Sequence, residues 1–352
     1  MSSRAATVST AEIASILEDE NLEHYGFAEL KTPVSIALYE DWLARGFQGE
    51  MRYLERHLPE KREPERLMKR ARTAIVVILD YLPHPEPVAK THPRRELKGL
   101  RIAAYARGRD YHYFLRERLD RVIEKLKRLA PEEEFRAFTD SAPVLERDLA
   151  ARAGLGWVGK NTCLLNRKKG SLFFIAEIYT TLALNVAKIE QRDHCGTCTR
   201  CLEACPTGAL VSPRTLDARL CISYLTIESR RIPPPELREK IGDWFFGCDE
   251  CQIVCPWNIK IHGREKLESL HPQKENRQVL LEDLRFILTA SSRELERVFA
   301  GTPLTRAGGW GLKRNALIVA ANSRISELRE EIQTLTTHPK LGELASWALE
   351  RL

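Results

Sequence analysis

Eight of the nine cysteines stand in one stretch, which reads Cys195-x2-Cys198-x2-Cys201-x3-Cys205-Pro206, then Cys221, then Cys248-x2-Cys251-x3-Cys255-Pro256. A cubane iron–sulfur cluster needs four converging thiolates, and closely spaced turns of the backbone can supply three of them. In proteins with two such clusters, the cysteine before the proline reaches across to the other cluster. The spacing therefore predicts two [4Fe-4S] clusters, the first held by Cys195, Cys198, Cys201 and Cys255, the second by Cys248, Cys251, Cys205 and Cys221.

Other roles for these cysteines fit the pattern less well. Disulfides suit small secreted chains, whereas this chain has 352 residues and opens without an apolar signal segment. Zinc sites also use Cys-x2-Cys pairs, but zinc does not account for the two Cys-x3-Cys-Pro endings. We expect the ninth cysteine, Cys163, to be a small buried side chain. Reduced cysteines and oxygen-sensitive clusters predict a cytoplasmic location.

Composition bounds the remaining possibilities. The chain is 43% hydrophobic, long enough for two or three domains, and has no run of about 18 apolar residues that would span a membrane. The formal net charge is +6, and two oxidised clusters with their thiolates reduce it to roughly +2. Charge alone is therefore a weak argument for nucleic-acid binding, although basic pairs recur along the chain. No heptad or long apolar stripe appears, which favours a monomer.

The first 185 residues alternate between predicted strands and helices. An apolar run at 74–81 predicts a buried strand, with further strands at 101–106, 135–140 and 172–181. Helices are expected at 113–129 and 143–153, and the pair Ser9 and Glu12 forms a capping box that opens another. This order predicts an α/β (α+β) domain over 1–185 with covered sheet faces, followed by a ferredoxin-like domain with two [4Fe-4S] clusters over 186–265.

Asp140 follows one of these strands and precedes a predicted helix. Aspartate is a preferred helix N-cap, so capping is one role for it, and donating a proton is the other. The glycine-rich stretch from Gly154 to Asn161 lacks the order of a P-loop and is more typical of a turn.

Residues 275–352 are predicted to be helical. The phrase Arg314-Asn315-Ala316-Leu317 within paired amphipathic helices resembles a short HEAT-type repeat. Such arrays offer a curved surface to a macromolecule, and the alternative is a plain helical cap on the cluster domain.

Several motifs together resemble epoxyqueuosine reductase, and the resemblance runs over nearly the whole chain. They are Gly108-Arg109-Asp110-Tyr111-His112, Thr139-Asp140-Ser141-Ala142-Pro143-Val144-Leu145-Glu146, Gly156-Trp157-Val158-Gly159-Lys160-Asn161, Cys195 to Pro206 with Thr207-Gly208-Ala209-Leu210, and Gly247-Cys248-Asp249-x-Cys251-Gln252-x-Val254-Cys255-Pro256-Trp257-Asn258.

The resemblance implies an enzyme that depends on cobalamin and on two [4Fe-4S] clusters and performs the last step of queuosine synthesis. The epoxide on the modified wobble base of tRNA is reduced to an alkene, with electrons from a flavodoxin or ferredoxin type of donor. The family's N-terminal domain resembles that of cobalamin-dependent reductive dehalogenases and holds the corrinoid. A reductive dehalogenase-like reductase of a small molecule is the alternative function, followed by an electron-transfer protein and a non-catalytic RNA-binding protein.

The resemblance also assigns residues. Asp140 would be the acid that protonates the opening epoxide, with its pKa raised by a dry pocket, and Tyr105, Tyr111 and His112 are the alternative acids. Contacts to cobalamin would come from Arg62, Asp140, Lys160, Asn161, Ser171 and Asp249.

Overall fold

The computed structural model describes residues 8–83, 95–186, 189, 192–270 and 277–352. The chain divides into two compact units. The first comprises Met1–Gly46, Met51–Pro83 and Tyr111–Cys198, and the second comprises Phe47–Glu50, His84–Asp110 and Thr199–Leu352. Within the described ranges, no helix is long and apolar enough to cross a membrane.

A four-stranded sheet forms the centre of the first unit, in the order β1-β2-β7-β4. Its strands are β1 (Tyr25–Glu29), β2 (Thr73–Asp80), β7 (Phe173–Thr180) and β4 (Phe135–Phe138). All three strand pairings are antiparallel. Glu177 of β7 lies opposite Val76 of β2 on one side and Phe138 of β4 on the other. The sheet is therefore of the α+β kind, because an α/β order would have given parallel neighbours.

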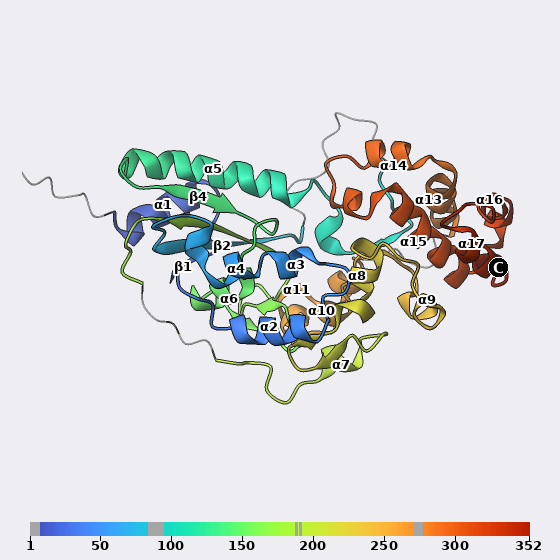
Figure 1. Ribbon diagram of the computed structural model, residues 1–352, viewed down its shortest axis with the longest axis horizontal. Helices are drawn as coiled ribbons and strands as arrows, with labels where there is room; N and C mark the ends of the chain where they lie inside the picture. Colours follow the sequence, from blue (N-terminus) through green and yellow to red (C-terminus); the bar gives the residue numbers. More distant parts are fainter. Residues whose placement is uncertain (1–7, 84–94, 187–188, 190–191, 271–276) are drawn as a thin grey trace, which may run out of the picture. The chain divides into compact units, whose positions relative to one another are not determined.

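Helices cover both faces of this sheet. On one face α5 (Tyr111–Leu129) lies along β4 and β7 and contacts α1 (Thr10–Asp19) (Figure 1). On the other face α6 (Glu146–Arg152) packs on β1, β2 and β7, and its Leu149 and Ala150 share a core with Ala74 and Val76. The covered faces and the capping box at Ser9 are confirmed.

The approach of α6 to β1 is close. A Cβ atom at Gly26 of β1 would lie 2.1 Å from the carbonyl oxygen of Ala153, directly after α6, so only glycine fits. The remaining elements of the first unit are short: α2 (Ile36–Ala44), α3 (Tyr53–Arg56), α4 (Leu58–Arg62), the 3-10 helix η1 (Pro64–Arg66), and a hairpin of β5 (Trp157–Val158) and β6 (Leu164–Leu165).

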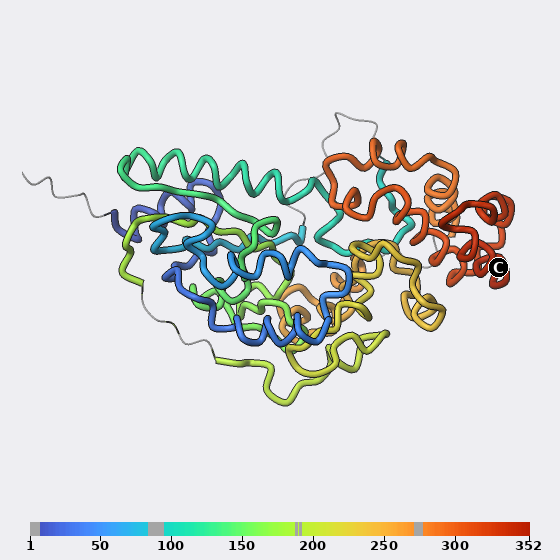
Figure 2. The backbone as a smooth tube through the Cα atoms, in the orientation of Figure 1, coloured from blue at the N-terminus to red at the C-terminus, as the bar shows by residue number. Residues whose placement is uncertain are grey.

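The second unit contains most of the cysteine stretch and the helices after it. Its elements up to residue 270 are β3 (Arg101–Ile102), η2 (Ala104–Ala106), α7 (Arg200–Glu203), β8 (Leu210–Ser212), β9 (Thr215–Leu216), η3 (Ala218–Leu220), α8 (Ile222–Ile227), α9 (Pro235–Ile241), β10 (Trp244–Phe246), α10 (Glu250–Ile253), α11 (Pro256–His262) and α12 (Arg264–Glu268). From Arg277 onward, orange to red in Figure 2, the chain forms α13 (Arg277–Thr289), α14 (Ser292–Val298), η4 (Pro303–Ala307), α15 (Gly308–Asn322), η5 (Ser326–Leu328), α16 (Arg329–Thr334) and α17 (Gly342–Leu349).

Helix α15 is buried in the centre of this unit. It packs on α13, α14, α17, α8, α9 and β10. Arg314, which is fully buried, donates to the carbonyl oxygens of Ser229, Arg231 and Leu225 at 2.6 to 3.0 Å. The side chain of Asn315 donates to the carbonyl oxygens of Thr226 and Phe245. The Arg-Asn phrase thus joins α15 to the segments that follow Cys221 and precede Cys248.

One predicted strand is wrong. Only Arg101 and Ile102 of the expected strand 101–106 are extended, and they pair in parallel with β10 of the second unit. The chain then turns into η2, because the buried carboxylate of Asp249 accepts the N–H of Ala104 at 2.7 Å. The helix expected from Pro143 begins three residues later, at Glu146.

Candidate functional site

Asp140 occupies a turn between β4 and α6. Its backbone has φ +44°, in the left-handed region that non-glycine residues seldom adopt. It is not a helix cap, because the N-cap of α6 is Leu145 and no side chain caps that helix. The capping role considered from the sequence is therefore wrong, because the carboxyl group of Asp140 does not cap this helix.

Two proton-bearing side chains of α5 meet the Asp140 carboxyl group. The hydroxyl of Tyr111 donates to Oδ2 at 2.5 Å, and Nε2 of His112 lies 3.3 Å from the same oxygen. Tyr111 also stacks on Phe174 of β7, with ring centroids 4.5 Å apart and planes within 12°. The Asp140 side chain is 58% exposed. The stacked tyrosine therefore holds a carboxyl group that lies at the surface of the first unit.

Buried charged groups lie beneath this turn. Glu146, on the first turn of α6, accepts the backbone N–H of Asp140 with Oε1 at 2.5 Å. Burial of its carboxyl group, reinforced by the charge of Asp140, raises the pKa of Glu146 to about 8. Lys61 is also buried, and this burial lowers its pKa, while Glu146 counteracts the effect.

Glu177 of β7 is the most deeply buried member of the group. Its pairing with Val76 and Phe138 directs its side chain to the α6 face of the sheet. It is fully buried, and among the described residues neither carboxyl oxygen has a hydrogen-bond partner. Burial, with the charges of Glu146 and Asp140, holds its pKa well above the usual range and so favours the protonated carboxyl group in the folded chain.

Sequence reasoning did not single out Glu146 or Glu177. The signal for Glu177 was present, because it is the single charged residue inside the apolar run from Phe173 to Thr180. A charge in a strand that is buried on both faces points to a special environment.

Two predicted cofactor residues contact polar groups of the protein. Arg62, half-exposed, is paired with Glu40 of α2. Lys160 donates from Nζ to the carbonyl oxygens of Gly196 at 2.6 Å and Cys198 at 3.0 Å. Lys160 therefore ties the glycine-rich turn to the start of the cysteine stretch.

The other three predicted cofactor residues are buried. The side chain of Asn161 accepts the N–H of Cys163 at 3.2 Å, and Ser171 is 6% exposed. Asp249 is 1% exposed, and burial raises its pKa to about 6, although the hydrogen bond from Ala104 opposes that rise.

The structure describes all nine cysteines, and none of them forms a disulfide. The short helices α7 and α10, which carry Cys201 and Cys251, pack on each other. Cys221 begins α8 near Cys248, and its charge adds to burial in raising the pKa of the Cys248 thiol. The assignment of Cys221 and Cys248 to one cluster stays a prediction. Cys163 is half-buried rather than buried as expected.

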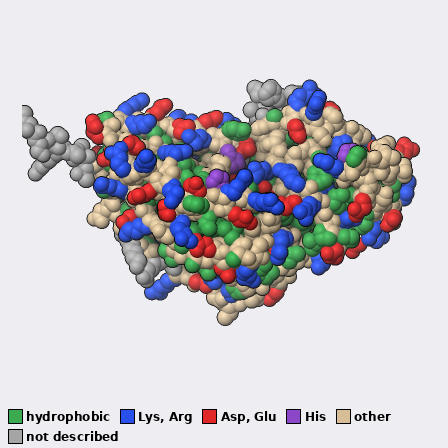
Figure 3. Space-filling view, in the orientation of Figure 1, with side chains coloured by type: hydrophobic (Ala, Val, Ile, Leu, Met, Phe, Trp, Pro, Cys, Tyr) green, Lys and Arg blue, Asp and Glu red, His purple; other side chains and the backbone are tan. Residues whose placement is uncertain are grey.

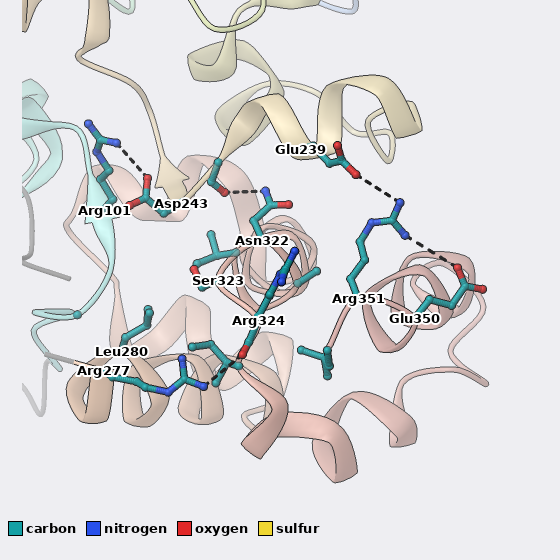
Figure 4. A pocket seen from close by; sticks show the side chains of 16 residues that line it. Arg101, Glu239, Asp243, Arg277, Leu280, Asn322, Ser323, Arg324, Glu350 and Arg351 are labelled. Carbon is teal, nitrogen blue, oxygen red and sulfur yellow. Dashed lines mark hydrogen bonds and ion pairs between the residues drawn. The ribbon is translucent and has the colours of Figure 1, made fainter. Parts of the chain in front are cut away.

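A cavity of about 1090 Å³ lies elsewhere, in the second unit, and none of the predicted site residues lines it (Figure 4). Four arginines face it, and three of these pair with carboxylates: Arg101 with Asp243, Arg277 with Glu327 and Arg351 with Glu239. Basic and acidic side chains are both present on the face shown in Figure 3. The lining of the cavity thus carries charges of both signs.

The buried Glu177 gives stability a pH dependence that can be measured. The folded state retains a proton that the unfolded chain releases above the usual glutamate pKa of 4.5. Folded Glu177 therefore costs more stability as pH rises, by at most about 1.4 kcal/mol per pH unit. Because glutamine carries no ionisable proton, the Tm of Glu177→Gln relative to the wild type should increase between pH 5 and pH 8.

The exposed Glu132 provides the matched control, since Glu132→Gln removes a carboxyl group that water already solvates. Its Tm difference from the wild type should not change with pH. A constant Tm difference for Glu177→Gln over the same range would contradict the protonated state of Glu177.

Comparisons with known proteins cover both the segment that ends near Asp140 and the cysteine stretch. A family model described as "Epoxyqueuosine reductase QueG, DUF1730" matches residues 61–141, and one described as a "4Fe-4S double cluster binding domain" matches residues 194–258. The epoxyqueuosine reductase of Pseudomonas aeruginosa is 37% identical over 334 residues, which are 94% of this chain and 90% of the relative. That of Escherichia coli is 37% identical over 88% of this chain and 80% of the relative.

Solved structures give the same result. An epoxyqueuosine reductase crystallised with an epoxyqueuosine-modified stem loop of tyrosine tRNA superimposes with a TM-score of 0.78 and 28% identity, over 97% of this chain and 89% of that one. The Bacillus subtilis epoxyqueuosine reductase was solved with its aspartate-bearing catalytic loop swung out of the active site. It superimposes with a TM-score of 0.76 and 28% identity, over 96% of this chain and 89% of that one. Since relatives more than 30% identical cover nearly all of it, the chain belongs to the epoxyqueuosine reductase family.

Proposed function

We infer that this protein reduces the epoxide of epoxyqueuosine in tRNA and thereby forms queuosine. The observation that carries the inference is the 37% identity to the Pseudomonas aeruginosa enzyme over 94% of the chain. The chain therefore includes both the segment with Asp140 and the double-cluster segment. A relative has been solved with a modified tRNA stem loop, which supports tRNA as the substrate here.

The reaction sets the chemical requirements. The epoxide takes up two electrons and two protons, both C–O bonds break, and an alkene and water result. Iron–sulfur clusters pass electrons one at a time, so two clusters suit an electron relay. The opened oxygen leaves only when it is protonated, so an acid must stand beside it.

We propose cobalamin as the further cofactor. When bound, it supplies a low-valent cobalt centre that accepts single electrons and reacts with the strained ring. The exposed groups of the first unit fit such a ligand, because Asp140 and Arg62 offer an acceptor and donors that suit the amide side chains of a corrinoid. Lys160, Asn161, Ser171 and Asp249 stay predicted contacts.

We propose Asp140 as the acid. Its carboxyl group is exposed, it caps no helix, and the Tyr111 hydroxyl holds its orientation. The catalytic loop of the Bacillus subtilis relative bears an aspartate and can swing away from its active site. By analogy, the turn from Thr139 to Val144 is the candidate catalytic loop of this chain.

We also propose a domain organisation, a tRNA-binding surface and an oligomeric state for this chain. We propose domains at 1–185, 186–265 and 275–352. The helical tail, which we propose to be HEAT-like, would give the tRNA a helical surface beside the clusters. Basic pairs would contact its phosphates. We also propose a monomer in the cytoplasm, reduced by a flavodoxin or ferredoxin type of donor.

The predicted division of cysteines between the clusters can be tested directly. Cys255→Ala should remove the same electron paramagnetic resonance signal as Cys198→Ala, and Cys221→Ala should remove the other. Cys163→Ala, which changes a cysteine outside the motif, should keep both signals. Loss of one and the same signal in Cys221→Ala and Cys255→Ala would refute the crossed arrangement.

Replacement of Asp140 by asparagine tests the acid. Asparagine keeps the size of the side chain and an oxygen for the Tyr111 hydroxyl, so the variant should fold and retain both clusters and cobalamin. It has no acidic proton, so queuosine formation should fall about 100- to 10,000-fold. Mass spectrometry of tRNA nucleosides gives the rate. Turnover near that of the wild type would move the acid role to Tyr111 or His112.

A further inference from the structure

The turn that carries Asp140 is held by a contact to its backbone. Asp140 has φ +44°, a conformation that an L-residue leaves readily unless its surroundings fix it. Within the turn, Val144 donates its N–H to the carbonyl oxygen of Ala142 at 2.8 Å, and the Ser141 hydroxyl donates to that of Thr139 at 3.1 Å. Such local bonds would form in an isolated turn too, so they do not fix its place in the protein.

The contact from Glu146 differs, because it joins the turn to a helix. Oε1 of Glu146 accepts the N–H of Asp140 at 2.5 Å. The helix itself is well anchored. The carboxylate of Asp148 accepts the N–H of Ser35 and a guanidinium N–H of Arg152, each at 2.8 Å. Glu146 therefore reaches the turn from a rigid support.

The surroundings of Glu146 also restrict its side chain. Lys61 and Glu177 approach from the α4 and β7 sides, and Arg147 follows on the same helix. Lys61 in turn lies 3.4 Å from the carbonyl oxygen of Val144, the last residue of the turn. Lys61, which is buried, thus contacts the segment at Val144, and Glu146 contacts it at Asp140.

We propose that Glu146 is a positioning residue, which accepts the Asp140 N–H and so keeps the acid carboxyl group turned toward Tyr111 and His112. The proposal rests on the acid role of Asp140 inferred above. In this arrangement Glu146 contributes an acceptor atom and not a proton. Loss of the contact would free the turn and leave both clusters and their ligands unaffected.

Two substitutions of Glu146 separate position from protonation. Glutamine retains a carbonyl oxygen that can accept the Asp140 N–H, whereas alanine has no acceptor. Glu146→Ala should lower single-turnover queuosine formation by at least about tenfold, since small misplacements of a reacting group have effects of this size. Glu146→Gln should stay within about threefold of the wild type. Glu132→Ala, an exposed carboxylate of the same unit, serves as the control and should change nothing.

Amide hydrogen exchange of residues 139–144 supplies a readout that does not depend on the chemistry. Exchange there should be faster in Glu146→Ala and like the wild type in Glu146→Gln. If the alanine variant does not fold, Glu146→Asp, which is one methylene too short, takes its place with the same expectations.

Two results would overturn the proposal. One is wild-type exchange and turnover in the alanine variant. The other is an inactive glutamine variant with wild-type exchange, since Glu146 would then act through its proton. The acid role of Asp140 is tested separately, because a fully active Asp140→Asn would refute that role without altering the exchange result.

Discussion

The hydrogen bond between the Asp140 N–H and the Glu146 carboxyl group is the contact on which the candidate acid site depends. The acid has to stand at the surface to meet a large substrate, and exposed turns are usually poorly fixed. Here the exposed carboxyl group is attached to buried structure from two sides. Tyr111, stacked on Phe174, fixes its oxygen, and Glu146, seated on α6 over the buried Glu177, fixes its backbone. The site combines access with a defined geometry.

The second unit uses buried polar contacts in the same way. Arg314 and Asn315 donate to carbonyl oxygens at and just after the C-terminal end of α8, and Asn315 also donates to the Phe245 carbonyl oxygen. Thr226 of α8 accepts the N–H of Gly247, the residue before Cys248. Because a buried carbonyl group left without a donor is costly, these contacts make α15 part of the scaffold around the cysteines. The helical tail therefore shares its core with the segments that present Cys221 and Cys248.

The sequence was sufficient for features with a strong local signature. The cysteine spacing, the capping box at Ser9 and the apolar strands β2 and β7 depend on neighbours in the chain, and the structure contains the helix and strands as expected. Features set by distant contacts could not be predicted. The strand expected after Arg101 ends early because Asp249 accepts the N–H of Ala104, and Asp140 does not cap α6 because that helix begins only at Glu146, with Leu145 as its N-cap. The carboxyl pair of Glu146 and Glu177 arises only when β7 and α6 pack together.

Conversion of epoxyqueuosine to queuosine in tRNA by this chain requires both clusters and cobalamin. The most direct measurement is mass spectrometry of nucleosides from epoxyqueuosine-containing tRNA after anaerobic incubation with the reconstituted protein, cobalamin and a strong reductant. We expect a nucleoside that is lighter than epoxyqueuosine by one oxygen atom, about 16 Da. It should form only when cobalamin and both clusters are present. Unchanged epoxyqueuosine in a preparation with full cluster and cobalamin content, or equal conversion without cobalamin, would contradict it.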